Sequence, residues 1–106
     1  MGKRSRDKGQ RGERMLVHLL QERGYAAERV PLSGAAGGSY KGDLSVPVLG
    51  IDRLIEAKWR AGGFAQLYSW LGDNYALVVK ADRKRPLLVI PLDRAIDVLD
   101  AAEATR

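Results

Sequence analysis

Two carboxylates and a lysine stand at the ends of two apolar stretches in the middle of the chain. Asp43 opens the stretch at 43–48, and Glu56 and Lys58 close the stretch at 53–58. Along the second stretch the residue types alternate with a period of two, which predicts a β-strand. Because a strand directs residues i and i+2 to one face, we expect Glu56 and Lys58 to point in the same direction.

An acid and a base on one face, with a further acid nearby, could hold a divalent cation. If the two stretches pair in antiparallel fashion around a turn near Gly50, Asp43 and Glu56 converge on a single ion. Carboxylates that close repel each other unless a cation or a proton lies between them. Mg²⁺ suits the pair because it binds oxygen at about 2.1 Å and keeps several waters for chemistry. Lys58 adds a positive charge where a phosphate or an attacking water would lie.

The same residues also fit a surface hairpin in which Glu56 and Lys58 form an ordinary exposed ion pair. E-x-K is a common sequence, and by itself it favours this simpler interpretation. The stretch at 33–42 has four glycines in ten positions, predicts an irregular loop, and leads directly into Asp43. An acid at the matching position, preceded by such a loop, favours the metal site.

Helices and strands must position these residues, and the pattern of apolar residues predicts where they lie. Apolar residues at helical spacing predict a helix over 7–23 that ends at Gly24. Pro47 predicts an edge or a bulge for the strand that follows Asp43. The expected strands are 25–32, 43–48, 53–58, 75–80 and 87–91, and the other expected helices are 64–72 and 92–104. This order, αβββαββα, predicts an α/β fold with a mixed sheet covered by helices.

Length and composition limit the class of protein. A chain of 106 residues, 45% of them hydrophobic, is sufficient for one domain. Cysteine is absent, which excludes a disulfide scaffold and a thiolate metal site and favours an intracellular protein. No apolar run approaches the roughly 20 residues of a membrane helix, and the N-terminus lacks the apolar segment of a signal peptide. We expect a soluble, cytoplasmic protein, either associated with the nucleoid or phage-encoded and acting in the host cytoplasm.

Positive charge is concentrated in two places. The net charge is +5, and residues 1–14 hold six basic residues against two acidic ones. A second cluster lies at an expected turn and consists of Lys80, Arg83, Lys84 and Arg85. Clustered basic charge is typical of proteins that bind polyanions, although each cluster alone is equally compatible with a solvated tail or turn. Together with the candidate metal site, the two clusters favour nucleic acid as the partner.

The spacing of the acids and the lysine resembles the signature of the PD-(D/E)XK nuclease superfamily, in which an acid and a short gap precede E-A-K or a similar triplet. Within that superfamily the chain is similar to the archaeal-type Holliday junction resolvases. The features that carry this similarity are Lys8-Gly9, Glu13-Arg14, Arg29 and Ser33-Gly34, besides Asp43 and Glu56-Ala57-Lys58. Two features differ: Gly42 stands where the superfamily name has proline, and the segment 60–70 with Gln66 is similar to the VRR-NUC branch of repair nucleases.

This resemblance implies a restriction-endonuclease-like core, a mixed five-stranded sheet flanked by helices, in one nuclease domain over 1–106 with a basic N-terminal arm at about 1–8. It implies Mg²⁺-dependent hydrolysis of DNA phosphodiester bonds, with Mn²⁺ as a substitute, and four-way junctions cut by a homodimer. The implied catalytic residues are Glu13, Asp43, Glu56 and Lys58, of which Lys58 orients or activates the attacking water. The implied metal ligands are Asp43, Glu56 and the backbone carbonyl of Ala57, with Glu13 acting through a water or a second ion. The implied DNA-binding residues are Lys3, Arg4, Arg6, Lys8, Arg11, Arg14, Arg29, Ser33, Arg60 and Gln66.

Simpler interpretations of single residues stay open. Glu13 also fits an ordinary surface acid of the first helix, paired with a neighbouring arginine, and Ser33 fits an ordinary loop residue. His18 favours packing or a surface position over catalysis. Trp59 and Trp70 could stack on bases or pack in the protein. For the whole chain, the alternatives are a VRR-NUC-like nuclease that acts on flaps or ends and a DNA-binding module without catalysis.

Overall fold

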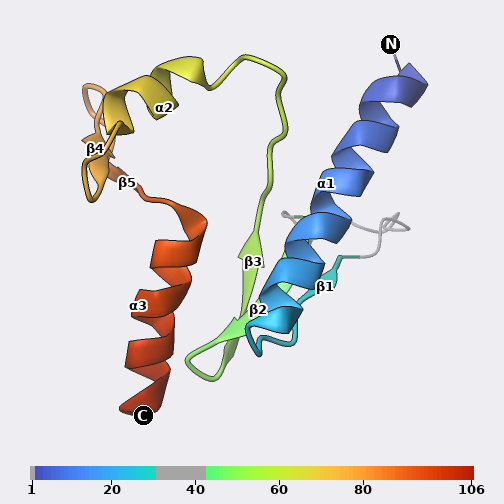
Figure 1. Cartoon of the computed structure of the whole chain (residues 1–106), viewed down its shortest axis with the longest axis vertical. Coiled ribbons are helices and arrows are strands. Elements are labelled where there is room, and N and C mark those ends of the chain that lie inside the picture. Colours follow the sequence, from blue (N-terminus) through green and yellow to red (C-terminus); the bar gives the residue numbers. More distant parts are fainter. Residues whose placement is uncertain (1, 31–42) are drawn as a thin grey trace. The chain divides into compact units, whose positions relative to one another are not determined.

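A computed structural model describes the backbone of residues 2–30 and 43–106 and the side chains of 9–30 and 43–106. The chain forms two compact units, Met1–Trp59 and Arg60–Arg106, and each is described by itself. Figure 1 shows both units, with the first in blue to green and the second in yellow to red.

The first unit begins with a long helix, α1, that spans Gly2–Glu22. It therefore starts at Gly2 rather than at residue 7, so most of the expected N-terminal arm is helical. Its C-terminus is a Schellman motif, in which the N–H of Gly24 donates to Gln21 O (3.0 Å) and the N–H of Tyr25 donates to Leu20 O (3.0 Å). Gly24 has a φ of 95°, which glycine adopts without steric cost. The expected end of the helix at Gly24 is confirmed.

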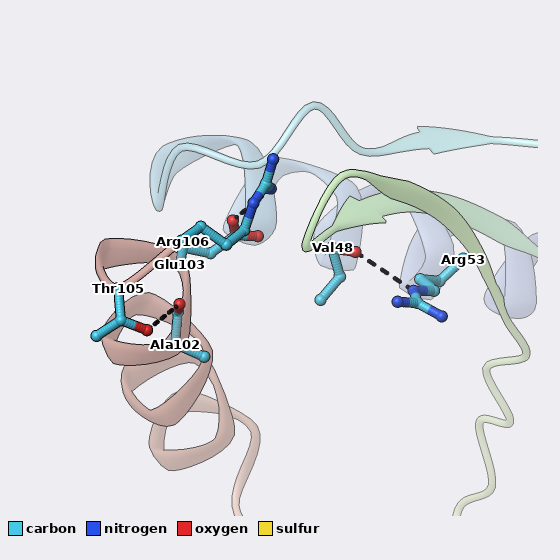
Figure 2. Close-up of polar contacts among 6 residues, drawn as sticks. All are labelled: Val48, Arg53, Ala102, Glu103, Thr105 and Arg106. Atoms are coloured by element: carbon cyan, nitrogen blue, oxygen red, sulfur yellow. Dashed lines mark hydrogen bonds and ion pairs between the residues drawn. The ribbon is translucent and has the colours of Figure 1, made fainter.

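In the described part of the first unit, α1 is followed by three antiparallel strands in the order β1-β2-β3. They are β1 (Glu28–Arg29), β2 (Leu44–Val48) and β3 (Ile51–Ile55). The hairpin between β2 and β3 turns at Leu49 and Gly50, whose φ angles of 54° and 83° are both positive, as a type I′ turn requires. Arg53 stabilises this hairpin by donating from Nε to Val48 O (3.3 Å; Figure 2). The expected antiparallel pair with a turn near Gly50 is confirmed.

The core of the first unit forms where the end of α1 meets one face of the sheet. Leu44 and Val46 are i and i+2 on β2 and are almost completely buried, at 1% and 2% exposure. Leu20, Tyr25 and Ala27 are also buried and come from the last turn of α1 and the segment leading to β1. In Figure 1, α1 runs alongside β1, with which it is in contact. Burial of each large apolar side chain contributes about 1.5–3 kcal/mol to stability.

The second unit consists of a short helix, a two-stranded antiparallel sheet and a final helix. These elements are α2 (Ala65–Leu71), β4 (Leu77–Val79), β5 (Leu87–Val89) and α3 (Leu92–Ala104). Ile96 of α3 is fully buried. Arg94 of α3 hydrogen-bonds Tyr75 O and lies 4.5 Å from the centroid of the Tyr75 ring. Arg106 pairs with Glu103 at 3.0 Å just after the end of α3 (Figure 2).

The predicted mixed five-stranded sheet is wrong for the part of the chain that the structure describes. Its strands form one three-stranded and one two-stranded sheet, and every pairing is antiparallel. The physical reason is local: β4 and β5 have three residues each, and the connection at residues 80–86 lets each use the other as its antiparallel partner. The fold remains α/β, and the three helices lie close to their predicted positions.

Two smaller differences concern the strands of the first unit. The strand expected over 53–58 ends at Ile55, so Glu56 and Lys58 lie just beyond β3. Pro47 lies in the central strand rather than an edge strand, but β1 pairs only with Leu44 and Ser45. Among the described residues, Pro47 therefore pairs with β3 only, so its other side lacks a strand partner, as in an edge strand.

Within residues 2–30 and 43–106, no helix combines the length and the hydropathy that crossing a membrane requires.

Candidate functional site

Asp43 stands immediately before β2 and is held by three hydrogen bonds. Its N–H donates to Ile55 O (2.9 Å), and its carbonyl accepts from the N–H of Val30 (2.9 Å). Its carboxylate Oδ2 accepts from the N–H of Ala57 at 2.8 Å. That N–H belongs to the peptide that joins Glu56 to Ala57. The pairing of β2 with β3 thus brings the Asp43 carboxylate to the backbone beside Glu56.

Glu56 and Lys58 form an ion pair, with 2.8 Å between Glu56 Oε2 and Lys58 Nζ. The two side chains therefore point in the same direction, as expected, even though the strand has already ended at Ile55. Both are largely exposed, at 53% for Glu56 and 58% for Lys58. Exposed ion pairs of this kind contribute between about 0 and 1 kcal/mol. A phosphate or a cation can therefore separate them at little cost.

Glu13, on α1, has a different partner. Its Oε1 accepts a hydrogen bond from Arg29 Nε and pairs with Arg29 Nη2, both at 3.1 Å. The side chains are 21% exposed for Glu13 and 32% for Arg29, so this pair is better shielded from water than Glu56 and Lys58. The predicted neighbours Arg11 and Arg14 are exposed on α1. The structure thus links the first helix to β1 through a charged pair that joins two predicted site residues.

The carboxylates do not form a single group of three. Among residues 2–30 and 43–106, no three acidic or histidine side chains are close enough together to hold a metal ion. Mg²⁺ in nucleotide and nucleic-acid enzymes usually needs only one or two carboxylates, because waters and substrate phosphates complete its shell. Asp43 and Glu56, two carboxylates beside one peptide, fit that requirement. Glu13 points to Arg29 instead, and its predicted part in metal binding stays a prediction.

The other predicted site residues fall into two groups. One group lies outside the described part of the structure: Ser33 as a whole, and the side chains of Lys3, Arg4, Arg6 and Lys8. The backbone of these four basic residues belongs to α1. Arg60 and Gln66 are exposed and belong to the second unit. His18 is exposed on α1, in agreement with a surface position.

The second basic cluster lies on the connection between β4 and β5. Its members Lys80, Arg83, Lys84 and Arg85 are all exposed. Three of them, Lys80, Lys84 and Arg85, line a hollow of about 450 Å³ together with Val79, Ala81 and Leu87. The aliphatic parts of these side chains lie next to apolar residues while their charges remain accessible to solvent.

Sequence reasoning missed the contact between Gly12 and Trp59. Gly12 is buried within α1, and a Cβ placed on it would meet the six-membered ring of the Trp59 indole. The signal available in the sequence was the glycine itself, since glycine inside a helix costs about 1 kcal/mol relative to alanine and usually has a packing reason. A glycine pattern alone does not identify the partner, because the partner lies 47 positions further along the chain.

Comparison with known families agrees with the chemistry of these residues. Residues 4–104 match the family described as "Phage putative PDDEXK endonuclease". No curated protein and no solved structure matches the chain. The family match supports the PD-(D/E)XK superfamily and a nuclease, but not the archaeal-type Holliday junction resolvases specifically. Because the match covers nearly the whole chain, the protein belongs to this family of phage PDDEXK endonucleases.

Proposed function

We propose that the protein is a metal-dependent DNA endonuclease whose reaction takes place at Asp43, Glu56 and Lys58. The observation that carries this proposal is the hydrogen bond from Ala57 N–H to the Asp43 carboxylate, 2.8 Å long. It holds the Asp43 carboxylate against the peptide that joins Glu56 to Ala57. The family match to PDDEXK endonucleases supports the same reaction class and implies DNA as the substrate.

Each residue has a defined part in the proposed reaction. Asp43 and Glu56 would hold Mg²⁺, with the backbone carbonyl of Ala57 as a further oxygen ligand. The ion would supply Lewis-acid stabilisation of the charge that builds up on the phosphate. Lys58, released from its exposed pair with Glu56, would orient the attacking water and balance negative charge on the phosphate. Asp43 stays oriented throughout, since the N–H of Ala57 fixes one of its oxygens.

Affinity for DNA would come from basic residues away from this site. Arg11 and Arg14 are exposed on α1, which also carries Glu13. The cluster at Lys80, Arg83, Lys84 and Arg85 provides a second positive surface. Contacts of this kind bind phosphates and position the duplex without reading its sequence.

For the preferred DNA structure, we propose the four-way junction, cut by a homodimer. The support is the similarity of Lys8-Gly9, Glu13-Arg14 and Arg29 to the motifs of archaeal-type resolvases. A four-way junction needs two symmetric nicks, and a C₂ dimer is the simplest arrangement that supplies two sites. Flaps or DNA ends are the competing substrates, favoured by the segment 60–70. Sedimentation of the free protein at micromolar concentration tests the dimer, and a monomer would contradict it.

The decisive experiment measures cleavage of labelled four-way junction, flap, nicked and linear DNA, each with Mg²⁺, with Mn²⁺ and with EDTA. We expect cleavage with either ion, none with EDTA, and the highest rate on the junction. Asp43→Asn should abolish cleavage, because a neutral amide is a poor ligand for Mg²⁺. Asp52→Asn is the matched control, since Asp52 is an exposed acid on β3 in the same hairpin. Equal cleavage by the Asp43→Asn protein, or undiminished cleavage in EDTA, would contradict the proposed site.

A further inference from the structure

Helix α1 and the segment after β3 approach each other more closely at Gly12 than any side chain on the helix would allow. A Cβ at position 12 would lie 2.5 Å from Trp59 Cε3, 2.7 Å from Cδ2 and 2.9 Å from Cζ3. Real Cβ atoms essentially never come within 3.0 Å of another heavy atom in this way. The indole therefore occupies the space that a side chain at position 12 would fill. Only glycine permits the contact.

The other glycine in the described part of this helix shows that the requirement is specific. Gly9 lies one turn earlier on α1, and a Cβ placed there would have no heavy atom within 4 Å. Alanine is therefore compatible with position 9 and incompatible with position 12. Both glycines have helical backbone conformation in α1, so alanine substitutions at the two positions can be compared directly.

Each of the two residues in the Gly12–Trp59 contact is a sequence neighbour of a predicted site residue. Gly12 immediately precedes Glu13, and Trp59 immediately follows Lys58. Glu13 is tied to β1 through Arg29, and Lys58 is tied to Glu56. The thickness of the indole ring thus sets how closely the part of α1 that carries Glu13 can approach the segment that carries Glu56 and Lys58.

We infer that Trp59, seated on Gly12, is a positioning residue that fixes the spacing between the helix carrying Glu13 and the Glu56–Lys58 segment. This inference rests on the proposed nuclease function, which places Glu56 and Lys58 in the reaction. An alanine at position 12 would need the ring and the helix to separate by about 0.9 Å, from 2.5 Å to the ordinary contact distance of 3.4 Å. Displacements of about 1 Å in a catalytic arrangement can lower a rate by about 100-fold.

The contact also limits what else Trp59 can do. Trp59 is 38% exposed, so the larger part of its surface is already covered. A base-stacking role, in which the ring would be presented to DNA, would make DNA affinity sensitive to Trp59. A positioning role makes the turnover number sensitive and leaves DNA affinity nearly unchanged. The two roles therefore predict opposite effects on kcat and KM.

The test compares Gly12→Ala with Gly9→Ala in the full chain carrying Trp70→Phe. The sequence has two tryptophans, so this background leaves Trp59 as the only indole fluorophore. Emission, quenching by acrylamide, thermal unfolding, and kcat and KM on labelled junction and linear DNA are measured for each protein. We expect Gly9→Ala to match the background in all of them. We expect Gly12→Ala to shift the Trp59 emission to longer wavelength, to increase quenching, and to lower kcat about 10- to 100-fold with KM changed less than twofold.

Two further variants keep the result decisive if Gly12→Ala does not fold. Trp59→Ala cannot clash with Gly12, and it should lower kcat by a similar factor with KM nearly unchanged. In the double variant Gly12→Ala/Trp59→Ala, the alanine at position 12 should cause no additional loss, because the ring that it would displace is gone. Trp59→Phe, which keeps a six-membered ring, should restore part of the kcat lost in Trp59→Ala.

Several outcomes would overturn the inference, and they differ from failure of the nuclease proposal. An unchanged Trp59 emission in a folded Gly12→Ala protein would contradict the contact itself. A shifted emission with an unchanged kcat, or a wild-type kcat in Trp59→Ala, would contradict the positioning role while the nuclease proposal stands. A raised KM with an unchanged kcat in Trp59→Ala would indicate base stacking instead. If the background protein cuts none of the DNAs with either metal, the proposed function and the positioning role both fail, and emission still decides the contact.

Discussion

The two units of the chain differ in how they use their side chains. Of the buried apolar residues in the described part of the chain, Leu20, Tyr25, Ala27, Leu44 and Val46 belong to Met1–Trp59 and only Ile96 belongs to Arg60–Arg106. The first unit also makes the polar contacts between distant candidate residues, from Glu13 to Arg29 and from Asp43 to Ala57.

The second unit instead exposes charge and apolar surface. Its β4–β5 connection carries four exposed basic residues, and the cross-strand pair Val78 and Leu88 is 64% and 63% exposed. A two-stranded sheet alone is marginally stable in water, so it offers little rigidity for catalytic geometry. The difference teaches that the proposed chemistry needs the first unit, while the second unit adds a basic surface to the one that Arg11 and Arg14 provide on α1. In the proposed reaction, catalysis depends on the packed first unit, and the second unit is suited to phosphate contacts, which tolerate small displacements.

The largest effect should come from removing the lysine of the candidate site. Lys58→Ala should lower cleavage about 100- to 1,000-fold, because the loss of one group that stabilises charge in the transition state typically costs this much. DNA affinity should change less than threefold, since the basic surfaces elsewhere supply it. Gel-shift and cleavage assays on the same protein check both values. Loss of affinity in parallel with cleavage would mean that Lys58 binds DNA rather than acting in the reaction.

Truncation of the first unit's core should come next. Leu44→Ala should destabilise the protein by about 2–5 kcal/mol, because Leu44 is 1% exposed and a cavity would remain. Leu88→Ala in the second unit should cost less than about 0.5 kcal/mol, because Leu88 is 63% exposed. Urea unfolding of both variants gives the comparison. Similar losses in the two variants would contradict the difference between the units.

The charged pair between α1 and β1 should have an intermediate effect. Arg29→Ala leaves the partly buried Glu13 carboxylate without the guanidinium, and we expect a loss of about 1–2 kcal/mol. Arg106→Ala, which removes a more exposed pair with Glu103, should cost at most a few tenths of a kcal/mol. Chemical denaturation with both variants in one buffer checks the difference. Arg29→Lys should recover only part of the loss, because an ammonium cannot reproduce two guanidinium contacts.

The smallest effect should come from the second unit's basic cluster. Lys84→Ala combined with Arg85→Ala should reduce the slope of log affinity against log salt by about 2, since each phosphate contact contributes about 1. The turnover number at saturating DNA should stay unchanged. Arg106→Ala is the control, because it removes one positive charge from the same unit outside the cluster. An unchanged slope would show that this cluster does not contact DNA.

Much of the local structure could be predicted from residues that determine backbone conformation by themselves. Gly24 ends α1 because it can adopt a positive φ, and Gly50 permits the tight β2–β3 turn for the same reason. The helix over Leu92–Ala104 follows from the spacing of its apolar residues. The joint direction of Glu56 and Lys58 is likewise a short-range property, and the ion pair at 2.8 Å agrees with it.

Only the tertiary structure decided which distant residues meet. Strand patterning is the same whether β4 pairs with β5 or with another strand, so the sequence alone could not distinguish one five-stranded sheet from two smaller ones. The partner of Glu13 came from β1 rather than from its own helix, because packing of α1 against the sheet determines which guanidinium can reach it. The contact between Trp59 and Gly12 likewise depends on the tertiary structure. Glycine provides the space, and the path of the chain after β3 determines which side chain fills it.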